Sequence, residues 1–144
     1  NATATTEIYT YTESSAASDV YKRQLSGGMQ QRVGLVRAFA IDAPILLMDE
    51  PFAALDEMTR TDMRHLLVRL SEPLGTTVLF VTHSIPEATF LSDRVAVMSP
   101  RPGRLTEDIT IDLDHPRLPE LEDTDDFFHT TTRLRAALSD GMQR

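Results

Sequence analysis

The sequence of 144 residues contains no cysteine and no long apolar run. The absence of cysteine excludes disulfide bonds and thiolate metal sites, and it is compatible with a reducing cytoplasm. No segment approaches the roughly 18 apolar residues that a membrane-spanning helix needs. The N-terminus is rich in Thr and Ser and lacks the apolar core of a signal peptide. The remaining composition, with 41% hydrophobic and 25% charged residues, is typical of a single globular domain.

Positive charge is scarce, and the formal net charge is -8. Binding to a nucleic-acid backbone needs a basic face, so this balance argues against nucleic acid as a partner. Much of the excess acid lies near the C-terminus, in Glu120, Glu122, Asp123, Asp125 and Asp126. Such a charge run is typical of a solvated loop, which here leads into a predicted terminal helix.

The only lysine is Lys22, in the sequence Tyr-Lys-Arg-Gln. A phosphate-binding P-loop requires Gly-Lys-Ser or Gly-Lys-Thr, because its lysine reaches the β- and γ-phosphates while backbone N–H groups surround them. The sequence contains no such element. This chain alone therefore cannot be a complete P-loop ATPase.

The first 24 residues show neither helical nor strand periodicity, and Thr, Ser and Ala dominate them. This composition predicts a disordered segment. Because the composition changes abruptly at Leu25, we also consider residues 1–24 to be a junction or tail foreign to the gene. Finding the same segment in frame at the native locus would refute that hypothesis.

A regular pattern begins at Ser26, a residue type that often caps the N-terminus of a helix. Asp42-Ala43-Pro44 then ends the predicted helix. Between these points four apolar residues recur with helical spacing. They form the apolar stripe of a predicted helix and are Met29, Val33, Val36 and Ala40.

Two short apolar runs predict buried parallel strands. The first spans 45–48 and ends in Asp49-Glu50-Pro51, and the second spans 77–81. The helix predicted between them ends at Gly75, a residue type that fits a helix C-terminus. Its apolar positions are Met63, Leu66, Leu67, Leu70 and Leu74.

The pattern continues with a short helix over 84–91 and a strand over 94–98. An alternating edge strand over 106–111 follows. The alternation of strands and helices predicts an α/β fold with a mainly parallel sheet, right-handed crossovers and flanking helices. A C-terminal helix completes the pattern, marked by Phe127, Thr131, Leu134 and Leu138.

Three chemically reactive side chains follow the two predicted parallel strands. Asp49 and Glu50 end the first strand, and His83 comes shortly after the second. If one crossover helix joins the strands, all three side chains emerge at the carboxyl edge of the sheet, where ligands of open α/β sheets bind. Two carboxylates and an imidazole are costly to gather unless a metal ion, a water molecule or a phosphate lies between them. We therefore predict that these residues form one site.

The residues around this site resemble the ATP-binding subunits of ABC transporters. Leu25-Ser-Gly-Gly-Met-Gln-Gln-Arg32 is similar to the ABC signature sequence, and Ile45–Pro51 resembles a Walker B strand with its catalytic glutamate. Ala54-Leu55-Asp56 is similar to the D-loop, and His83 falls where the family has its switch histidine. The four motifs occur in the family order, and the resemblance covers Leu25–Ile111. It implies a partial P-loop NTPase domain, the C-terminal half of an ABC ATPase.

The resemblance implies that ATP is held between two such subunits, by the P-loop of one and the signature of the other. Ser26, Gly27 and Gly28 would then direct backbone N–H groups toward the γ-phosphate of ATP. It also implies that Gln30 contacts the nucleotide and that Asp56 lies at the dimer interface.

For hydrolysis the resemblance implies three roles. Asp49 would help to hold Mg²⁺, a cation that prefers oxygen ligands. Glu50 would be the general base that orients or deprotonates the attacking water. His83 would hydrogen-bond to the γ-phosphate.

Three further stretches resemble the importers of nitrate, sulfonates, taurine and related compounds: 51–60, 82–88 and 98–104. This likeness implies permease subunits and, indirectly, a solute-binding protein as partners, and a peripheral location on the cytoplasmic face of a bacterial membrane. The solute itself is chosen by those partners. The P-loop and the Q-loop of the family lie before its signature and are absent, so we expect the chain alone to bind ATP weakly without turning it over.

Two alternatives stay open. A non-transport ABC ATPase acting in DNA repair or on ribosomes shares the signature and the Walker B strand, although we find neither coiled-coil heptads nor a tandem cassette. The polypeptide could instead be an inactive fragment. On either reading the expected divisions of the chain are a tail at 1–24, the ATPase half at 25–111, and an acidic loop with a terminal helix at 112–144.

Overall fold

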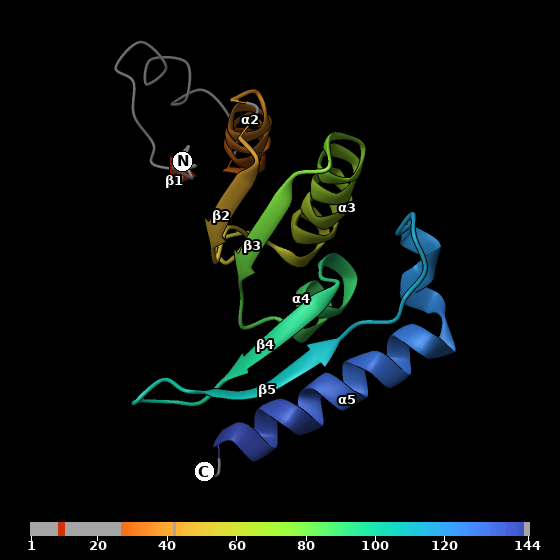
Figure 1. Ribbon diagram of the computed structural model, residues 1–144. Coiled ribbons are helices and arrows are strands. Elements are labelled where there is room, and N and C mark those ends of the chain that lie inside the picture. Colours follow the sequence, from red (N-terminus) through yellow and green to blue (C-terminus); the bar gives the residue numbers. More distant parts are fainter. Residues whose placement is uncertain (1–8, 11–26, 42, 143–144) are drawn as a thin grey trace, which may run out of the picture. The chain divides into compact units, whose positions relative to one another are not determined.

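The computed structural model describes residues 9–10, 27–41 and 43–142. The chain forms two compact units, Asn1–Val81 and Thr82–Arg144. The first unit contains strand β1 (Tyr9–Thr10), helix α2 (Gly27–Phe39), strand β2 (Ile45–Asp49), helix α3 (Glu57–Leu74) and strand β3 (Thr77–Val81), as Figure 1 shows. Elements α2, β2, α3 and β3 confirm the helices and strands predicted for this part of the chain.

The sheet of the first unit has the order β1-β2-β3, and both strand pairs are parallel. Ile45 pairs with Thr77 and Asp49 pairs with Val81, so β2 and β3 begin and end together. Parallel neighbours need a crossover connection, which α3 supplies. The predicted parallel pair with its crossover helix is therefore confirmed, and the Asp49-Glu50 sequence lies at the carboxyl end of the sheet.

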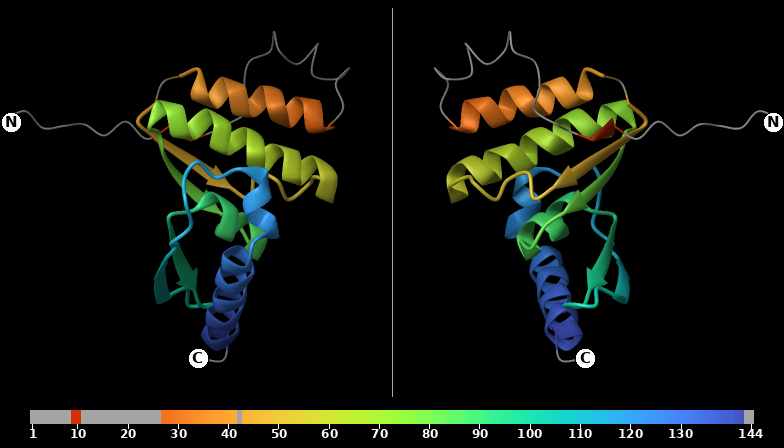
Figure 2. Two further views of the ribbon diagram at one scale, coloured as in Figure 1. Left: turned by 90° about the vertical axis from the view of Figure 1, so that its right-hand side faces the viewer. Right: turned by 90° about the vertical axis from the view of Figure 1, so that its left-hand side faces the viewer.

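Within the first unit the two helices pack on one face of the β2–β3 sheet and lie side by side (Figure 2). On β2 the alternate residues Leu46 and Met48 are buried. Val78 and Phe80 on β3 are half-buried, while Leu79 and Val81 on the opposite face are exposed. The prediction that β3 is a buried strand is wrong for the described residues, because the helices described in this unit cover one face of the sheet only.

The apolar stripe that predicts α2 is not the buried face of the helix. Met29, Val33 and Val36 are 51%, 43% and 50% exposed. The face that packs against the sheet and α3 is offset from that stripe, and its buried side chains are Leu35, Ala38 and Phe39. Both sets have helical spacing, so periodicity predicts the helix correctly without identifying its buried face.

Helix α3 has defined ends. At its N-terminus Asp56 is the N-cap, and its carboxylate accepts hydrogen bonds from the Thr59 N–H at 3.0 Å and the Thr59 Oγ1 at 2.9 Å. At its C-terminus Gly75 adopts φ 61° and donates its N–H to the Glu72 carbonyl. Glycine reaches this left-handed conformation without steric cost, which confirms the predicted helix stop.

The second unit contains helix α4 (Ile85–Leu91), strands β4 (Arg94–Met98) and β5 (Leu105–Thr110), a 3₁₀ helix (Pro119–Asp123) and helix α5 (Asp125–Met142). β4 and β5 form an antiparallel pair. The expectation that β4 belongs to a parallel sheet is therefore wrong for the described structure, because the short 99–104 connection makes a hairpin with the next strand.

A small core holds the second unit together. α5 packs against α4 and against the β4–β5 hairpin. Its buried residues Phe127 and Leu134 belong to the same core as Phe90, Val97 and Ile109. The predicted terminal helix is thus confirmed. The acidic run is not a loop as predicted: Glu120, Glu122 and Asp123 lie in the 3₁₀ helix, and Asp125 and Asp126 form part of the first turn of α5.

A buried arginine joins the loop before the 3₁₀ helix to the end of α4. Arg117 is 3% exposed, and its guanidinium donates to the carbonyls of Phe90 and Ser92 at 3.0 and 2.6 Å. It also reaches the Asp93 carboxylate at 3.0 Å. Carbonyls at a helix C-terminus lack partners within the helix, so this cation stabilises the end of α4.

Of the segment 1–24 the structure describes only Tyr9–Thr10, as a strand at a place where none was expected. The predicted disorder or foreign origin concerns residues that otherwise lie outside the described part. Among the described residues, no helix is both long and apolar enough to cross a membrane.

Candidate functional site

The turn after β2 holds Glu50 in an unusual backbone conformation. Its φ is 42°, and it is the only non-glycine residue with positive φ among the described residues. A side-chain-bearing residue in such a region costs on the order of 1–3 kcal/mol, and surrounding structure must maintain it. Two backbone hydrogen bonds do so: the Glu50 N–H donates to Val81 at 2.9 Å, and the Ala53 N–H donates to Glu50 at 3.2 Å.

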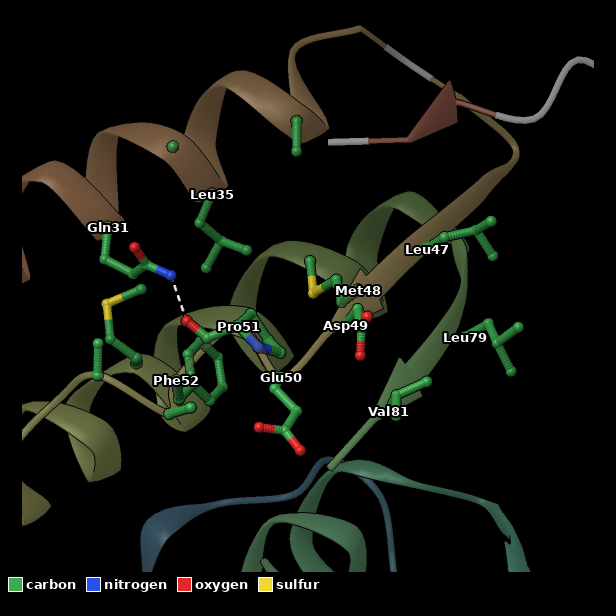
Figure 3. Close-up of a pocket in the computed structure, with 15 residues that line it drawn as sticks. Gln31, Leu35, Leu47, Met48, Asp49, Glu50, Pro51, Phe52, Leu79 and Val81 are labelled. Carbon is green, nitrogen blue, oxygen red and sulfur yellow. Dashed lines mark hydrogen bonds between the residues drawn. The ribbon is translucent and has the colours of Figure 1, made fainter. Parts of the chain in front are cut away.

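Two side-chain contacts hold the residues that follow Glu50. Phe52 is 1% exposed, and its ring lies 5.5 Å from that of Phe80 on β3. From α2 the Gln31 side-chain amide donates to the Pro51 carbonyl (Figure 3). Because Glu50 precedes these anchored residues directly, its backbone is connected to the sheet on one side and to α2 on the other.

The carboxylates of Asp49 and Glu50 border a pocket of about 820 Å³ within the first unit (Figure 3). Its other walls come from α2, from the turn after β2, and from Leu79 and Val81 on β3. The lining is mainly apolar, and both carboxylates are exposed. Ionised oxygens at the carboxyl edge of a parallel sheet are therefore available to a ligand or a cation.

The glycines of the signature-like sequence open α2. The helix begins at Gly27 and has no acidic residue in its first turn. The positive end of a helix dipole favours negatively charged groups. Gly28 packs against α3, since a β-carbon there would lie 2.8 Å from Thr59 Cγ2. Gln30 lies half-buried on the same helix, and Ser26 lies outside the described residues.

Asp56 has a structural role that the sequence did not predict. Its exposed carboxylate caps α3, and the hydrogen bonds from the Thr59 backbone and then the Thr59 hydroxyl lower its pKa below the usual range. The same Thr59 packs on Gly28. The D-loop-like and signature-like sequences are therefore in contact through one threonine.

His83 belongs to the second unit, where a short network holds its neighbours. The Thr82 hydroxyl donates to the Glu87 carboxylate at 2.5 Å and accepts the Ser84 N–H at 2.9 Å. Glu87 is 3% exposed, whereas His83 is exposed. The residues on both sides of His83 are thus fixed locally, and the meeting of His83 with Asp49 and Glu50 stays a prediction.

The motifs imply a Mg²⁺ ion at this edge of the sheet. Among the described residues no three His, Asp or Glu side chains gather closely enough to form a protein cage for a metal ion. Mg²⁺ usually keeps several waters and binds one or two carboxylates together with substrate phosphates. A single exposed carboxylate at position 49 fits that mode of binding.

Comparisons with known proteins agree with these motifs. A family model described as ABC transporter matches residues 2–53. An uncharacterized ABC transporter ATP-binding protein from Methanocaldococcus jannaschii is 54% identical over 99 residues, which are 69% of this chain and 37% of that protein. The chain belongs to the ABC transporter family.

Two named importers are also similar to this ABC transporter chain. A taurine import ATP-binding protein from Rhizobium johnstonii is 55% identical over 89 residues, covering 62% of this chain and 34% of that protein. An aliphatic sulfonates import ATP-binding protein from Bacillus thuringiensis is 45% identical over 97 residues, covering 67% and 39%. The chain thus spans little more than a third of the length of these relatives.

The fold of this chain is similar to solved structures of ABC transporter cassettes. The dimeric structure of a bacterial ABC transporter cassette has a TM-score of 0.53 and 38% identity over 65% of this chain and 39% of that one. A dimeric post-hydrolysis state bound to ADP and Pi has a TM-score of 0.51 and 38% identity, over 64% of this chain and 38% of that one. The predicted fold class, a partial α/β ABC ATPase domain, is confirmed.

The sequence reading missed Gln31 and Thr59. Both act through contacts between segments, with Gln31 hydrogen-bonded to a carbonyl 20 residues away. One signal was present, because Gln31 has helical spacing with the buried residues Leu35 and Ala38. A polar side chain on the buried face of a helix needs a hydrogen-bond partner.

Proposed function

We propose that this chain is part of the ATP-hydrolysing subunit of an ABC importer. The observation that carries the proposal is the Glu50 turn at the carboxyl end of β2, held by β3 and by the signature-like helix α2. The likeness to importer ATP-binding proteins supports it. ATP is the substrate, and the complete subunit couples its hydrolysis to uptake of a solute.

In this proposal Glu50 acts as the general base toward the water that attacks the γ-phosphate. Its carboxylate is exposed beside the pocket, and its constrained backbone fixes the direction in which the side chain leaves the turn. Asp49 would hold Mg²⁺, which neutralises phosphate charge when bound. His83, two residues after the strand that receives the Glu50 N–H, would hydrogen-bond to the γ-phosphate.

A second group of residues would contact the nucleotide that is held by the P-loop of a second copy of the subunit. Gly27 and Gly28 lie in the first turn of α2, whose positive end suits a phosphate group. Ser26 and Gln30 would add contacts to the same nucleotide, and Asp56 would lie near the subunit interface. The dimeric arrangement of the similar cassettes supports this division of labour.

The solute class proposed is that of nitrate, sulfonates or taurine, on the likeness to taurine and aliphatic sulfonate importers. The partners are then permease subunits and, through them, a solute-binding protein, with this subunit on the cytoplasmic face of the membrane. The chain alone is expected not to hydrolyse ATP, because no Gly-Lys-Ser or Gly-Lys-Thr sequence is present in it.

The test is ATP hydrolysis by the complete subunit assembled with its permease. Glu50→Gln keeps the size of the side chain and removes the base, so kcat should fall by roughly a hundredfold or more. Glu57→Gln, which changes an exposed acid in the first turn of α3, is the matched control and should keep most of the activity. Unchanged turnover in Glu50→Gln would exclude the role proposed for this carboxylate.

A further inference from the structure

The side chain of Gln31 on α2 forms a hydrogen bond to the turn after β2. Its amide donates to the carbonyl of Pro51, the residue directly after Glu50 (Figure 3). We propose that Gln31 is a positioning residue that holds the Glu50 turn in its left-handed conformation. The signature-like helix would thereby set the orientation of the base in its own subunit.

The Glu50 turn needs such support because its backbone is strained. A residue with a β-carbon at φ 42° is less stable than one in the ordinary regions, so the turn relaxes if its restraints are removed. On the sheet side the restraints are the Val81 carbonyl and the Phe52–Phe80 ring contact. On the helix side the observed restraint is the Gln31 amide.

The burial around Gln31 fits a restraint better than a surface contact. Gln31 lies on the packed face of α2, with Leu35 and Ala38 in the following turns, and lines the same pocket as Glu50. A hydrogen bond in a partly apolar environment is stronger than one in water, and its loss leaves a polar group without compensation. Helix formation alone does not require a glutamine on the packed face of the helix.

The position of Gln31 along α2 gives the contact a mechanistic meaning, which depends on the proposed function. Gly28 and Gln31 are three residues apart and therefore lie on neighbouring turns of the same helix face. A nucleotide that binds at the N-terminus of α2 would shift the helix as a rigid element. Gln31 would transmit that shift to Pro51 and Glu50, so that the nucleotide at one site orients the base at the other.

The structural part is tested in the full 144-residue chain, without nucleotide, by hydrogen exchange at the amides of Glu50 and Ala53. Gln31→Met keeps the side-chain volume but removes the donor, and it should raise exchange at both amides by roughly fivefold or more. Arg32→Ala is the control, because it removes an exposed ion pair to Asp62 on α3 from the same helix without touching Pro51. Unchanged exchange in Gln31→Met, or an equal rise in Arg32→Ala, would overturn the proposal.

The functional part uses the complete subunit assembled with its permease. Gln31→Met and Gln31→Ala should lower kcat roughly tenfold to a hundredfold with little change in the KM for ATP, since only the orientation of the base is lost. In a Glu50→Gln background the same changes should have almost no further effect. If Glu50→Gln is inactive but both Gln31 variants have normal kcat, the positioning role of Gln31 is refuted and the proposed function stands. If Glu50→Gln is active, the proposed function itself is refuted.

Discussion

Gly28, in the first turn of α2, packs directly on Thr59, in the first turn of α3. A β-carbon at position 28 would lie 2.8 Å from Thr59 Cγ2, closer than side-chain carbons normally approach. Thr59 also donates both its N–H and its hydroxyl to the Asp56 carboxylate. Close approach of two helices here therefore depends on glycine, and it joins the start of one helix to the cap of the other.

Gly28→Ala is expected to destabilise the first unit, because the methyl group forces α2 away from Thr59 or forces Thr59 off its rotamer. Overpacking of this kind costs about 1–3 kcal/mol, measurable by denaturant unfolding. Gly103→Ala is the control, since its added β-carbon would meet only Met98 Cε at 3.8 Å, an ordinary contact. Equal stability of the two variants would show that α2 and α3 are not held this closely.

Backbone strain at Glu50 can be tested by the sign of the difference in unfolding free energy between a glycine and an alanine variant. At an ordinary helix or strand position, glycine is less stable than alanine by about 0.5–1 kcal/mol. At φ 42° the order should reverse, so Glu50→Gly should exceed Glu50→Ala in unfolding free energy by about 1 kcal/mol. Both variants lose the carboxylate, which removes its interactions from the comparison. Alanine more stable than glycine would contradict the left-handed conformation.

The cap at Asp56 predicts a dependence of stability on pH. Hydrogen bonds from the Thr59 N–H and then from its hydroxyl lower the pKa of Asp56 below the ordinary value of an aspartate. A lowered pKa in the folded state means that the carboxylate stabilises the fold at pH values above its unfolded pKa. This stabilisation is lost as the pH falls through the folded pKa, below about pH 4.

Asp56→Asn tests that dependence by unfolding measured between pH 2 and pH 6, a range of roughly two units on either side of the unfolded pKa. Asparagine still accepts the Thr59 N–H but does not titrate, so the decline of stability on the acid side should be shallower than in the unsubstituted chain. Asp62→Asn removes one exposed acid from the same helix and serves as the charge control. The same acid slope in Asp56→Asn and the parent would rule out this contribution.

Arg117 is expected to be essential to the second unit. Replacing it with alanine leaves the carbonyls of Phe90 and Ser92 without their charged donor and removes a fully packed side chain. The expected loss is about 2–4 kcal/mol, seen as a lower Tm of this unit. Arg104→Ala, at an exposed position in the hairpin connection, should change Tm little. A small effect of Arg117→Ala would mean that water replaces the guanidinium at the end of α4.

Local features were correctly predicted wherever neighbouring residues are sufficient to determine them. The strands over 77–81 and 94–98, the stop at Gly75 and the terminal helix all match the structure. Strand and helix periodicity and capping depend on interactions within a few residues, so they can be read along the chain. The order of the four family motifs is likewise a property of the sequence, and the comparisons agree with the family that it indicates.

Tertiary structure alone decided which surfaces meet. Two stripes of α2 have helical spacing, and the packed one contains Leu35 and Ala38 rather than Met29 and Val33, because burial depends on what the sheet and α3 present. Likewise β4 pairs with β5 in a hairpin, and the amide of Gln31 reaches a carbonyl 20 residues away. These contacts are set by packing between distant segments, which sequence periodicity does not contain.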